Sequence, residues 1–349
     1  MIPRVAVTIV TYHSGLFIRA CLESVFAQQH VETQVIVVDN ASSDDTLDIL
    51  KEYESRIRLI VNRSNLGFAA AQNQAIASCD TEWVLVLNPD TVLEIGFVSQ
   101  LLEAGESDRD VGTVCGRMLA LRRDLRPLPS PRIDTAGIYF TPSLRHLDRG
   151  FREDDDGRYR QREYVFGASA AAALYRRAMI HDISLAGEFF DPDFFSYRED
   201  ADVAWRAQWR GWHCLYVPDA IGYHVRSVGP DQRRHVAPHI NMHSVKNRFL
   251  MRAKNMTGGL YRRFWLPITV RDVLVFGACL LWEQRSLPAF WRAAKCLPRA
   301  LRQRRWILSR RRVSDETMAQ WFNTQPSAKP LERAPAAVRN SLFLTERSR

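Results

Sequence analysis

The chain has few of the features that mark disulfide-bonded or membrane-spanning proteins. Its six cysteines are scattered through 349 residues without a CxxC pair or a histidine at metal-binding spacing, which predicts a reduced compartment. The longest apolar stretch, residues 264–282, is interrupted by Arg271 and Asp272, and the uncharged remainder, residues 273–282, is too short to cross a bilayer. The first residues lack the charged and apolar regions of a signal peptide.

Two common phosphate-binding loops are also missing. A dinucleotide-binding protein would carry GxGxxG after its first strand, where residues 11–15 read TYHSG. The P-loop pattern GxxxxGK[ST] does not occur either. If a nucleotide binds, it therefore binds through another arrangement.

Charge is divided unevenly along the chain. Residues 231–349 hold 24 Lys and Arg against 7 Asp and Glu, whereas residues 1–230 hold 24 against 32. A basic segment of this size is typical of proteins that contact phosphate, either in anionic lipid head groups or in nucleic acid. No nucleic-acid recognition motif accompanies it, so we do not expect nucleic acid to be a partner.

Strand and helix signals alternate through the first hundred residues. Apolar runs rich in β-branched residues predict strands, and apolar positions at helical spacing predict the helices between them. Repeated βα units wind into a parallel sheet, so we expect an α/β, Rossmann-like fold with helices on both faces of a mainly parallel sheet. The predicted strands are residues 5–10, 35–38, 57–61 and 83–87, and the predicted helices are residues 16–28, 47–53 and 67–77.

The pattern loosens after about residue 120. Residues 122–131 and 149–162 are expected to form mobile loops over a site, and the last strand of the domain, residues 213–217, follows a helix that begins near Glu199. Basic helices are expected between residues 239 and 312. We therefore divide the chain into a catalytic domain (residues 1–230), a basic helical C-terminal extension (231–323) and a flexible tail (324–349).

Polar residues follow several of the predicted strands. Thr11, Asp39 and Asp90 come after three of them, and in a wound sheet these residues share one edge, where ligands bind. An aspartate in this position is more often a turn residue or a helix N-cap. His224 follows the last strand, where a histidine is usually structural and a metal ligand is the alternative.

A second acidic cluster opens the helix near residue 199. Glu199, Asp200 and Asp202 would offset the helix dipole, and this role alone could explain one or two of them. Aromatic residues stand immediately before the acids, however, and a carboxylate with apolar walls can act as a general base. Both interpretations stay open at this point.

Together these segments form a known order of motifs. They are VTIVTY at residues 7–12, VDNASSD at 38–44, NLGFA at 65–69 with Asn73, LNPD at 87–90, and Glu199-Asp200 with Trp205-Arg206 and Gly211-Trp212. Over about residues 3–228 the chain resembles a family 2 glycosyltransferase of the GT-A fold, and more closely the bacterial rhamnosyltransferase-like branch. Residues 246–248 (KNR) and 310–314 also resemble the C-terminal extension of that branch.

The resemblance implies a role for each motif. Thr11 and Asp39 would contact the base and ribose of a nucleotide sugar, and Asp200 would deprotonate the acceptor hydroxyl while Glu199 positions the acceptor. Asp90 would be the metal ligand of a DxD-type motif, with His224 as a possible further ligand. The remaining nucleotide-sugar-binding residues would be Asn65, Gly67, Asn73 and Asn88.

One position departs from the DxD pattern, because Asn88 stands where an aspartate is expected. A metal would then rely mainly on Asp90 and the donor diphosphate, which suits Mg²⁺, with Mn²⁺ as a substitute. A single base and a metal imply direct displacement with inversion, since a retaining mechanism would need a nucleophile beneath the sugar.

The resemblance implies an inverting, metal-dependent transferase that extends a lipid-linked cell-surface polysaccharide such as O-antigen. We expect dTDP-rhamnose as donor, a polyprenyl-linked glycan as acceptor, and a peripheral location on the anionic cytoplasmic face of the inner membrane. Phe68, Asn73 and residues 139–162 are expected to influence selectivity. The alternatives are another donor such as a UDP-sugar, a nucleotidyltransferase, which would need a glycine- and lysine-rich loop after the first strand, and a non-catalytic membrane-associated scaffold.

Overall fold

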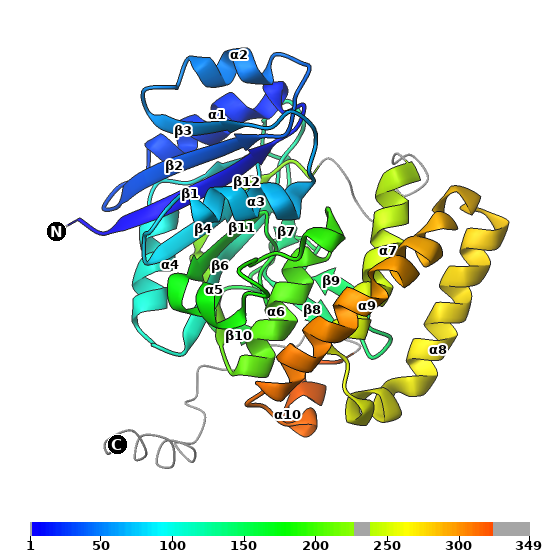
Figure 1. The fold of residues 1–349 in the computed structure, drawn as a ribbon. Helices are drawn as coiled ribbons and strands as arrows, with labels where there is room; N and C mark the ends of the chain where they lie inside the picture. The colour runs from blue at the N-terminus through cyan, green and yellow to red at the C-terminus, as the bar shows by residue number, and fades with distance from the viewer. Residues whose placement is uncertain (1, 227–237, 324–349) are drawn as a thin grey trace, which may run out of the picture.

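The computed structural model describes residues 2–226 and 238–323, and its centre is a mixed sheet between two layers of helices (Figure 1). The sheet has ten strands in the order β10-β12-β6-β11-β4-β1-β2-β3, with β5 beside β12 and β7 beside β6. This arrangement confirms the predicted α/β fold with a mainly parallel first half. The boundary near residue 230 and the tail at 324–349 lie outside the described residues.

The first half of the sheet is parallel, as expected. Strands β4, β1, β2 and β3 lie side by side, and the register pairs Thr11 with Asp39 at the end of β1 and β2. The bounds of the elements are β1 (Arg4–Thr11), α1 (Gly15–Phe26), β2 (Glu32–Asp39), α2 (Thr46–Lys51), β3 (Ile57–Val61), α3 (Phe68–Ala77), β4 (Trp83–Leu87), β5 (Thr91–Leu93) and α4 (Phe97–Glu106).

The second half mixes strand directions. β11 runs antiparallel to both β4 and β6, whereas β12 runs parallel to β6. Several strands here have only three residues, too few to show an alternating pattern in the sequence. The bounds are β6 (Val111–Ala120), β7 (Ile133–Thr135), β8 (Ile138–Phe140), β9 (His146–Asp148), β10 (Glu163–Val165), β11 (Ala172–Arg176), α5 (Arg177–Ile183), η1 (Pro192–Phe194), α6 (Glu199–Arg210) and β12 (His213–His224).

Strand β12 is longer than predicted. It continues to His224 instead of ending at Val217, because the chain bulges between Val217 and Ile221 and then resumes its pairing with β6. Pro218 lies in this bulge, where the missing N–H of a proline is tolerated. His224 is therefore the last residue of the strand and is held in its register, rather than following the strand.

Each face of the sheet buries its own hydrophobic cluster. Helices α1 and α4 cover one face, where Ile18, Leu22 and Leu101 pack against the sheet. Helices α3, α5 and α6 cover the other, with small residues of α3 such as Ala71 close to the strands. All six cysteines are free thiols, four of them buried.

The C-terminal helices pack on the side of α6. They are α7 (Pro238–Asn255), α8 (Gly258–Leu281), η3 (Gln284–Ser286), α9 (Pro288–Ser309) and α10 (Asp315–Ala319). Lys254 of α7 is fully buried and forms ion pairs with Asp191 at 2.6 Å and Asp202 at 2.9 Å. Charges are tolerated away from water only when they are paired with opposite charges. This contact therefore fixes α7 against the first part of the chain.

Helix α8 is the outermost of these helices (Figure 1). It is long and apolar enough to cross a membrane by length and composition, and 17% of its most apolar window is buried. Arg271 and Asp272, predicted to interrupt this apolar stretch, lie inside the helix. In the structure Asp272 forms ion pairs with Arg248 and Arg252 of α7, so its charge faces the protein.

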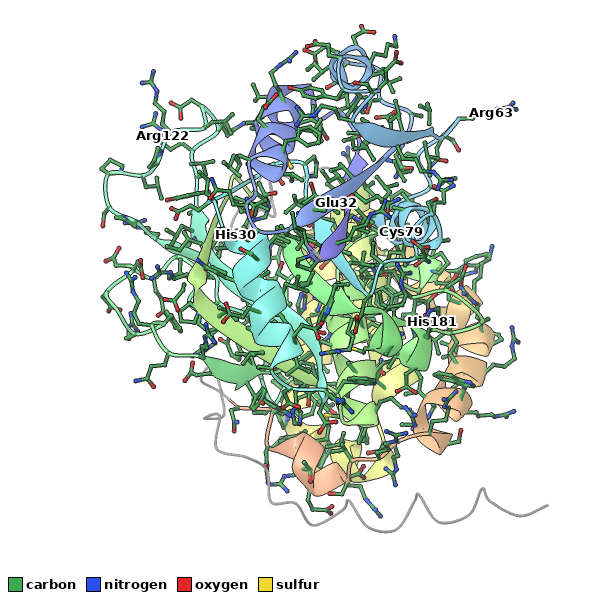
Figure 2. The ribbon with its side chains drawn as sticks, turned by 90° about the vertical axis from the view of Figure 1, so that its left-hand side faces the viewer. His30, Glu32, Arg63, Cys79, Arg122 and His181 are labelled. Atoms are coloured by element: carbon green, nitrogen blue, oxygen red, sulfur yellow. The ribbon has the colours of Figure 1, made fainter. Side chains whose placement is uncertain are left out.

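The two charged loops differ in their position. Residues 122–131 project at the periphery, where Figure 2 labels Arg122. Residues 149–162 lie against the domain: Arg149 is buried and pairs with Glu163, and Arg117 pairs with Asp155 at 3.2 Å. The second loop therefore has fixed contacts with the sheet.

Candidate active site

The ends of β1 and β2 carry two of the predicted nucleotide-binding residues. The Thr11 hydroxyl donates a hydrogen bond of 2.8 Å to Asp39 Oδ1, and the amide and hydroxyl of Ser42 donate to the same carboxylate at 2.9 and 2.6 Å. Asp39 is fully buried in this arrangement, so it holds the chain that follows β2. Its contact with a ribose stays a prediction.

Three further predicted residues connect α3 with the aromatic segment at residues 189–197. Asn65 Oδ1 accepts a hydrogen bond of 2.8 Å from the Gly67 amide. Gly67 has a φ of +84°, and a Cβ there would lie 2.5 Å from the Phe195 ring. Asn73 donates to the Phe190 carbonyl at 2.7 Å and accepts from its amide at 2.9 Å. The Asn73 side chain therefore holds the segment that leads to Glu199, and Gly67 leaves room for the Phe195 ring.

His224 lies between two carboxylates. Its Nε2 is 3.2 Å from Asp90 Oδ1, and its Nδ1 is 2.8 Å from Asp134 Oδ2. Burial disfavours the charged imidazolium, but the two carboxylates outweigh this effect and raise the pKa of His224 to about 10. Asn88 Nδ2 is 3.5 Å from the same Nε2, so the end of β12 meets the segment after β4.

Asp90 and His224 fit one side of a divalent-metal site. Carboxylate and neutral imidazole are both metal ligands, so a bound ion would take the place of the His224 Nε2 proton. A second carboxylate on the far ring nitrogen, here Asp134, is the usual way to orient a ligating histidine. Within residues 2–226 and 238–323, no group of three His, Cys, Asp or Glu side chains forms a complete site. The other ligands would come from a diphosphate and water, an arrangement that suits Mg²⁺ or Mn²⁺.

Helix α6 begins with two adjacent carboxylates, of which Glu199 is buried and Asp200 half-buried. The residues before them turn through the left-handed region, with φ of 67° at Phe195, 68° at Tyr197 and 72° at Arg198, a strained conformation for side chains of this size. The amides of Ala201 and Ala170 donate to the Asp200 carboxylate at 2.7 and 3.4 Å.

Their surroundings give the two carboxylates different proton affinities. Burial first, and then the Asp148 carboxylate, raise the pKa of Asp200 to about 6. Burial and the neighbouring Asp200 raise the pKa of Glu199 well above its usual range, and Glu199 Oε2 has no hydrogen-bond partner among the described residues. Near neutral pH Asp200 is therefore largely ionised and able to accept a proton, while Glu199 holds its proton more strongly than a free glutamate does.

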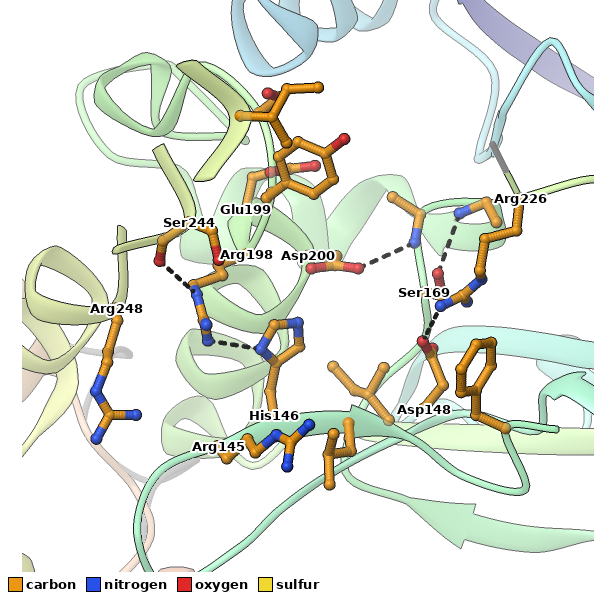
Figure 3. A pocket seen from close by; sticks show the side chains of 18 of the residues that line it. Arg145, His146, Asp148, Ser169, Arg198, Glu199, Asp200, Arg226, Ser244 and Arg248 are labelled. Carbon is orange, nitrogen blue, oxygen red and sulfur yellow. Dashed lines mark hydrogen bonds and ion pairs between the residues drawn. The ribbon is translucent and has the colours of Figure 1, made fainter. Parts of the chain in front are cut away.

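These groups line one cavity of about 680 Å³ (Figure 3). It extends from the sheet edge, past the start of α6, to α7 and α8. The predicted site residues that line it are Asn88, Asp90, Glu199, Asp200 and His224, together with Phe68 and part of the segment 139–162. The predicted residues that do not line it are Thr11, Asp39, Asn65, Gly67 and Asn73.

Sequence reasoning missed several residues of the cavity. Asp148 ends the three-residue β9, which is too short to show a pattern. Asp134, on the equally short β7, does not line the cavity but binds His224, which does. Arg226 joins them, with 2.7 Å between its guanidinium and each carboxylate. The sequence signal that could have identified Arg226 was its position two residues after His224. Arg145 and His146 come from the segment expected to influence selectivity.

Comparison with known sequences identifies the family of the chain. The model described as "Glycosyl transferase family 2" matches residues 6–184, just over half of the chain. The chain is 27% identical to an N-acetylglucosaminyl-diphospho-decaprenol L-rhamnosyltransferase of Mycobacterium tuberculosis, over 67% of this chain and 80% of that protein. It is also 27% identical to the O-antigen chain rhamnosyltransferase WbaN of Salmonella anatum, over 59% and 60% of the two chains.

Solved structures share the fold at low identity. The mannosyltransferase PcManGT of Pyrobaculum calidifontis, in complex with GDP-Man and Mn²⁺, aligns with a TM-score of 0.51 and 18% identity over 88% of this chain and 84% of its own. S. aureus TarS 1-349 in complex with UDP aligns with a TM-score of 0.53 and 18% identity over 91% of each chain. At this level of identity, both similarities are evidence for a shared fold alone.

Proposed function

The chain belongs to glycosyl transferase family 2 and is a glycosyltransferase, and on this premise we propose that it is an inverting, metal-dependent enzyme that transfers a sugar from a nucleoside diphosphate to an acceptor hydroxyl. One observation carries the proposal. A half-buried carboxylate with a pKa raised to about 6, Asp200, lines the same cavity as the Asp90 and His224 pair. A base and a diphosphate-binding end thus face a common space.

Asp90 and His224 would hold a divalent ion at the sheet edge. When bound, the ion neutralises the charge that develops on the departing diphosphate. Asn88 is neutral, so the protein would supply one carboxylate to this end of the cavity, while Asp134 keeps the His224 ring in place at 2.8 Å. Thr11 and Asp39, at the adjacent strand ends, are proposed to contact the ribose and base.

Asp200 would remove the proton of the acceptor hydroxyl as that oxygen attacks the anomeric carbon. The amides of Ala170 and Ala201 hold its oxygens in place, so the base is oriented before the acceptor arrives. Glu199 is disfavoured as a nucleophile because burial and the neighbouring Asp200 favour its protonated form, which argues against a covalent intermediate. It suits a second role, as a hydrogen-bond donor to the acceptor. One base and no ionised nucleophile support inversion.

The choice of donor and acceptor rests on the relatives. Two of them are named as rhamnosyltransferases, one of these acting on a diphospho-decaprenol and one on an O-antigen chain. We therefore favour dTDP-rhamnose as donor and a polyprenyl-linked glycan as acceptor, within polysaccharide biosynthesis. A UDP-sugar is the alternative donor.

The C-terminal helices are proposed to place the site on the cytoplasmic face of the inner membrane. The outer side of α8 exposes large apolar side chains, and basic residues follow on α9. A surface position is favoured over a span, because Arg271 and Val275 of α8 line the cavity and Asp272 pairs with α7. In this proposal residues 1–230 form the catalytic domain and 231–323 an extension fixed against it.

The test is Asp200→Asn. Transfer should fall about 10²–10⁴-fold, since the acceptor proton loses its base, while binding of the nucleotide sugar stays intact. Transfer would be measured with dTDP-rhamnose and a panel of UDP-sugars, and donor binding by calorimetry with Mg²⁺. The exposed Asp219→Asn is the matched control and should behave as wild type. Full activity of Asp200→Asn would remove Asp200 from the mechanism.

A further inference from the structure

One side of the cavity is lined by arginines. They come from four parts of the chain: Arg145 precedes β9, Arg198 precedes α6, and Arg248 and Arg271 lie on α7 and α8. Figure 3 shows Arg145, Arg198 and Arg248 on the side of the cavity opposite Asp148 and Arg226. The donor end, at Asp90 and His224, belongs to the sheet edge.

Neutral groups hold most of this side in place. Arg198 donates to the Ser244 carbonyl at 3.0 Å and to His146 Nδ1 at 2.8 Å. Arg248 donates to the Ser143 and Leu144 carbonyls and shares Asp272 with Arg252. Arg145 has no carboxylate partner within the described part of the chain. Four guanidinium groups thus gather on this side of the cavity.

His146 adds a neutral donor to the same side. Burial and then the surrounding arginines, Arg198 first, hold the pKa of His146 well below its usual range, so the ring is uncharged. Because Nδ1 accepts a hydrogen bond from Arg198, the proton of the neutral ring is on Nε2. This side of the cavity therefore offers N–H donors and positive charge, the chemistry that binds phosphate.

The arginine side also borders the exposed apolar surface of the molecule. Arg271 and Val275 line the cavity from α8, and the same helix exposes Leu274 by 59% and Val273 by 64%. A ligand with its phosphate at Arg271 would thus have its next atoms beside apolar side chains. A lipid diphosphate has this sequence of a charged group followed by a hydrocarbon chain.

We propose that Arg145, Arg198 and Arg271 form a binding subsite for the diphosphate of a polyprenyl-diphosphate-linked acceptor, with the polyprenyl chain leaving over α8. The inference rests on the proposed function and deepens it, because it assigns the acceptor end of the cavity. The diphosphate of the donor is the competing source of the same chemistry. The donor diphosphate is expected beside the metal at Asp90 and His224. Removing divalent ions should therefore weaken binding of the donor diphosphate and leave binding of the acceptor diphosphate.

The test measures binding of farnesyl diphosphate, a short polyprenyl diphosphate, to the full chain in EDTA by calorimetry. Wild type should bind it more tightly than inorganic pyrophosphate or farnesol, because the subsite and α8 both contribute. Arg145→Gln and Arg271→Gln should each weaken binding about tenfold, through the loss of one charged contact. Arg262→Gln, exposed on α8 outside the cavity, is the matched control and should leave binding unchanged.

Equal binding by wild type and both cavity variants would overturn the subsite, as would binding that needs Mg²⁺ and is displaced by a nucleoside diphosphate. Pyrophosphate binding as tight as farnesyl diphosphate binding would overturn the lipid assignment. Mg²⁺-dependent hydrolysis of nucleotide sugars, measured on the same preparations, tests the proposed function separately. If nucleotide-sugar hydrolysis were intact but the binding test failed, the subsite would be rejected and the proposed function would stand.

Discussion

Each carboxylate of the cavity owes its chemistry to its neighbours. Asp200 lies near Asp148, which raises its pKa, and near Arg226, which lowers it, with burial as the largest influence. Asp90 faces a histidine that is itself held by Asp134. Two aspartates on one cavity are therefore suited to different tasks, one to accept a proton and the other to hold a cation.

The pH dependence of transfer should report Asp200. A base must be ionised, so kcat/KM should fall as the pH drops through about 6. Asp148→Asn removes a carboxylate that raises this pKa, so the acidic limb should move to lower pH. The profile would be measured between pH 4.5 and 8 (roughly the range of an Asp with a raised pKa), with the exposed Asp156→Asn as control. An unmoved limb would contradict the assignment.

Loss of the Asp90 carboxylate should weaken use of the donor most at low Mg²⁺. With Asp90→Asn, we expect the Mg²⁺ concentration for half-maximal rate to rise at least about tenfold, because one anionic ligand is gone. Rates would be measured over a Mg²⁺ series beside Asp48→Asn, which changes an exposed carboxylate of α2. An Asp90→Asn variant with the same Mg²⁺ dependence as the wild type would refute the role of Asp90.

Helix α7 acts on the site through the segment before α6. Asn247 is fully buried, and its side-chain amide donates to the carbonyls of Phe194, Ser196 and Tyr197 at 2.8, 2.8 and 2.7 Å. These residues surround the left-handed turn that leads to Glu199 and Asp200. The helix therefore stabilises a backbone conformation that the segment would not adopt alone.

Asn247→Ala should lower both stability and turnover. Unfolding free energy should fall by about 3 kcal/mol, because buried carbonyls lose their donor. At a temperature where the variant is folded, kcat should fall about tenfold or more while the KM for the nucleotide sugar changes little, since misplacing the base affects the chemical step. Thermal unfolding and steady-state rates provide the measurements.

The matched control is Asn255→Ala on the same helix. Asn255 is equally buried but bonds to Asp202 and to the Met251 carbonyl, leaving the carbonyls of residues 194–197 untouched. It should lower the melting temperature with a smaller loss of kcat. An equal loss of kcat in both variants would mean that Asn247 contributes only general stability.

The molecule as a whole places its apolar surface next to the acceptor end of its cavity. Among its largest exposed apolar side chains, many belong to α8, including Trp265 and Leu266, and Trp282, directly after the helix, is 75% exposed. The inner side of the same helix lines the cavity at Arg271 and Val275. Membrane contact and acceptor entry would thus use opposite sides of one helix.

Leu274→Glu should reduce binding to vesicles that contain phosphatidylglycerol. The change removes apolar contact and adds a charge that anionic lipid repels, so the bound fraction should fall about tenfold. Co-flotation of the full chain with vesicles measures this fraction. Val61→Glu, at an exposed apolar position of β3, should float as wild type does. Undiminished flotation of Leu274→Glu would exclude α8 as the contact.

The first half of the fold could be read from the sequence, whereas the second half could be read only in part: α6 and β12 begin where predicted, at Glu199 and His213. β4 and α3 lie at the residues predicted or within one of them, because continuous apolar runs and helical spacing persist over enough residues. β7, β8 and β9 were missed because three residues show no period. The length of β12 was misjudged because its bulge interrupts the pattern.

The sequence alone determined which residue types stand at the strand ends and at the start of α6, because strand and helix patterns are local. Thr11, Asp39, Asp90 and Asp200 were all found in this way. Only the tertiary structure decided which of them share a space. It brought Asp90 and Asp200 into one cavity and placed Thr11 and Asp39 outside it.

The partners of these residues also depend on contacts distant in sequence. Asp134 reaches His224 across 90 positions, and Asn247 reaches the turn before α6 across about 50. The proton affinity of a buried group is set by what surrounds it, and no local pattern records those surroundings. Residue types were thus readable from the chain, while their pKa values and their common cavity arose from the packing of the fold.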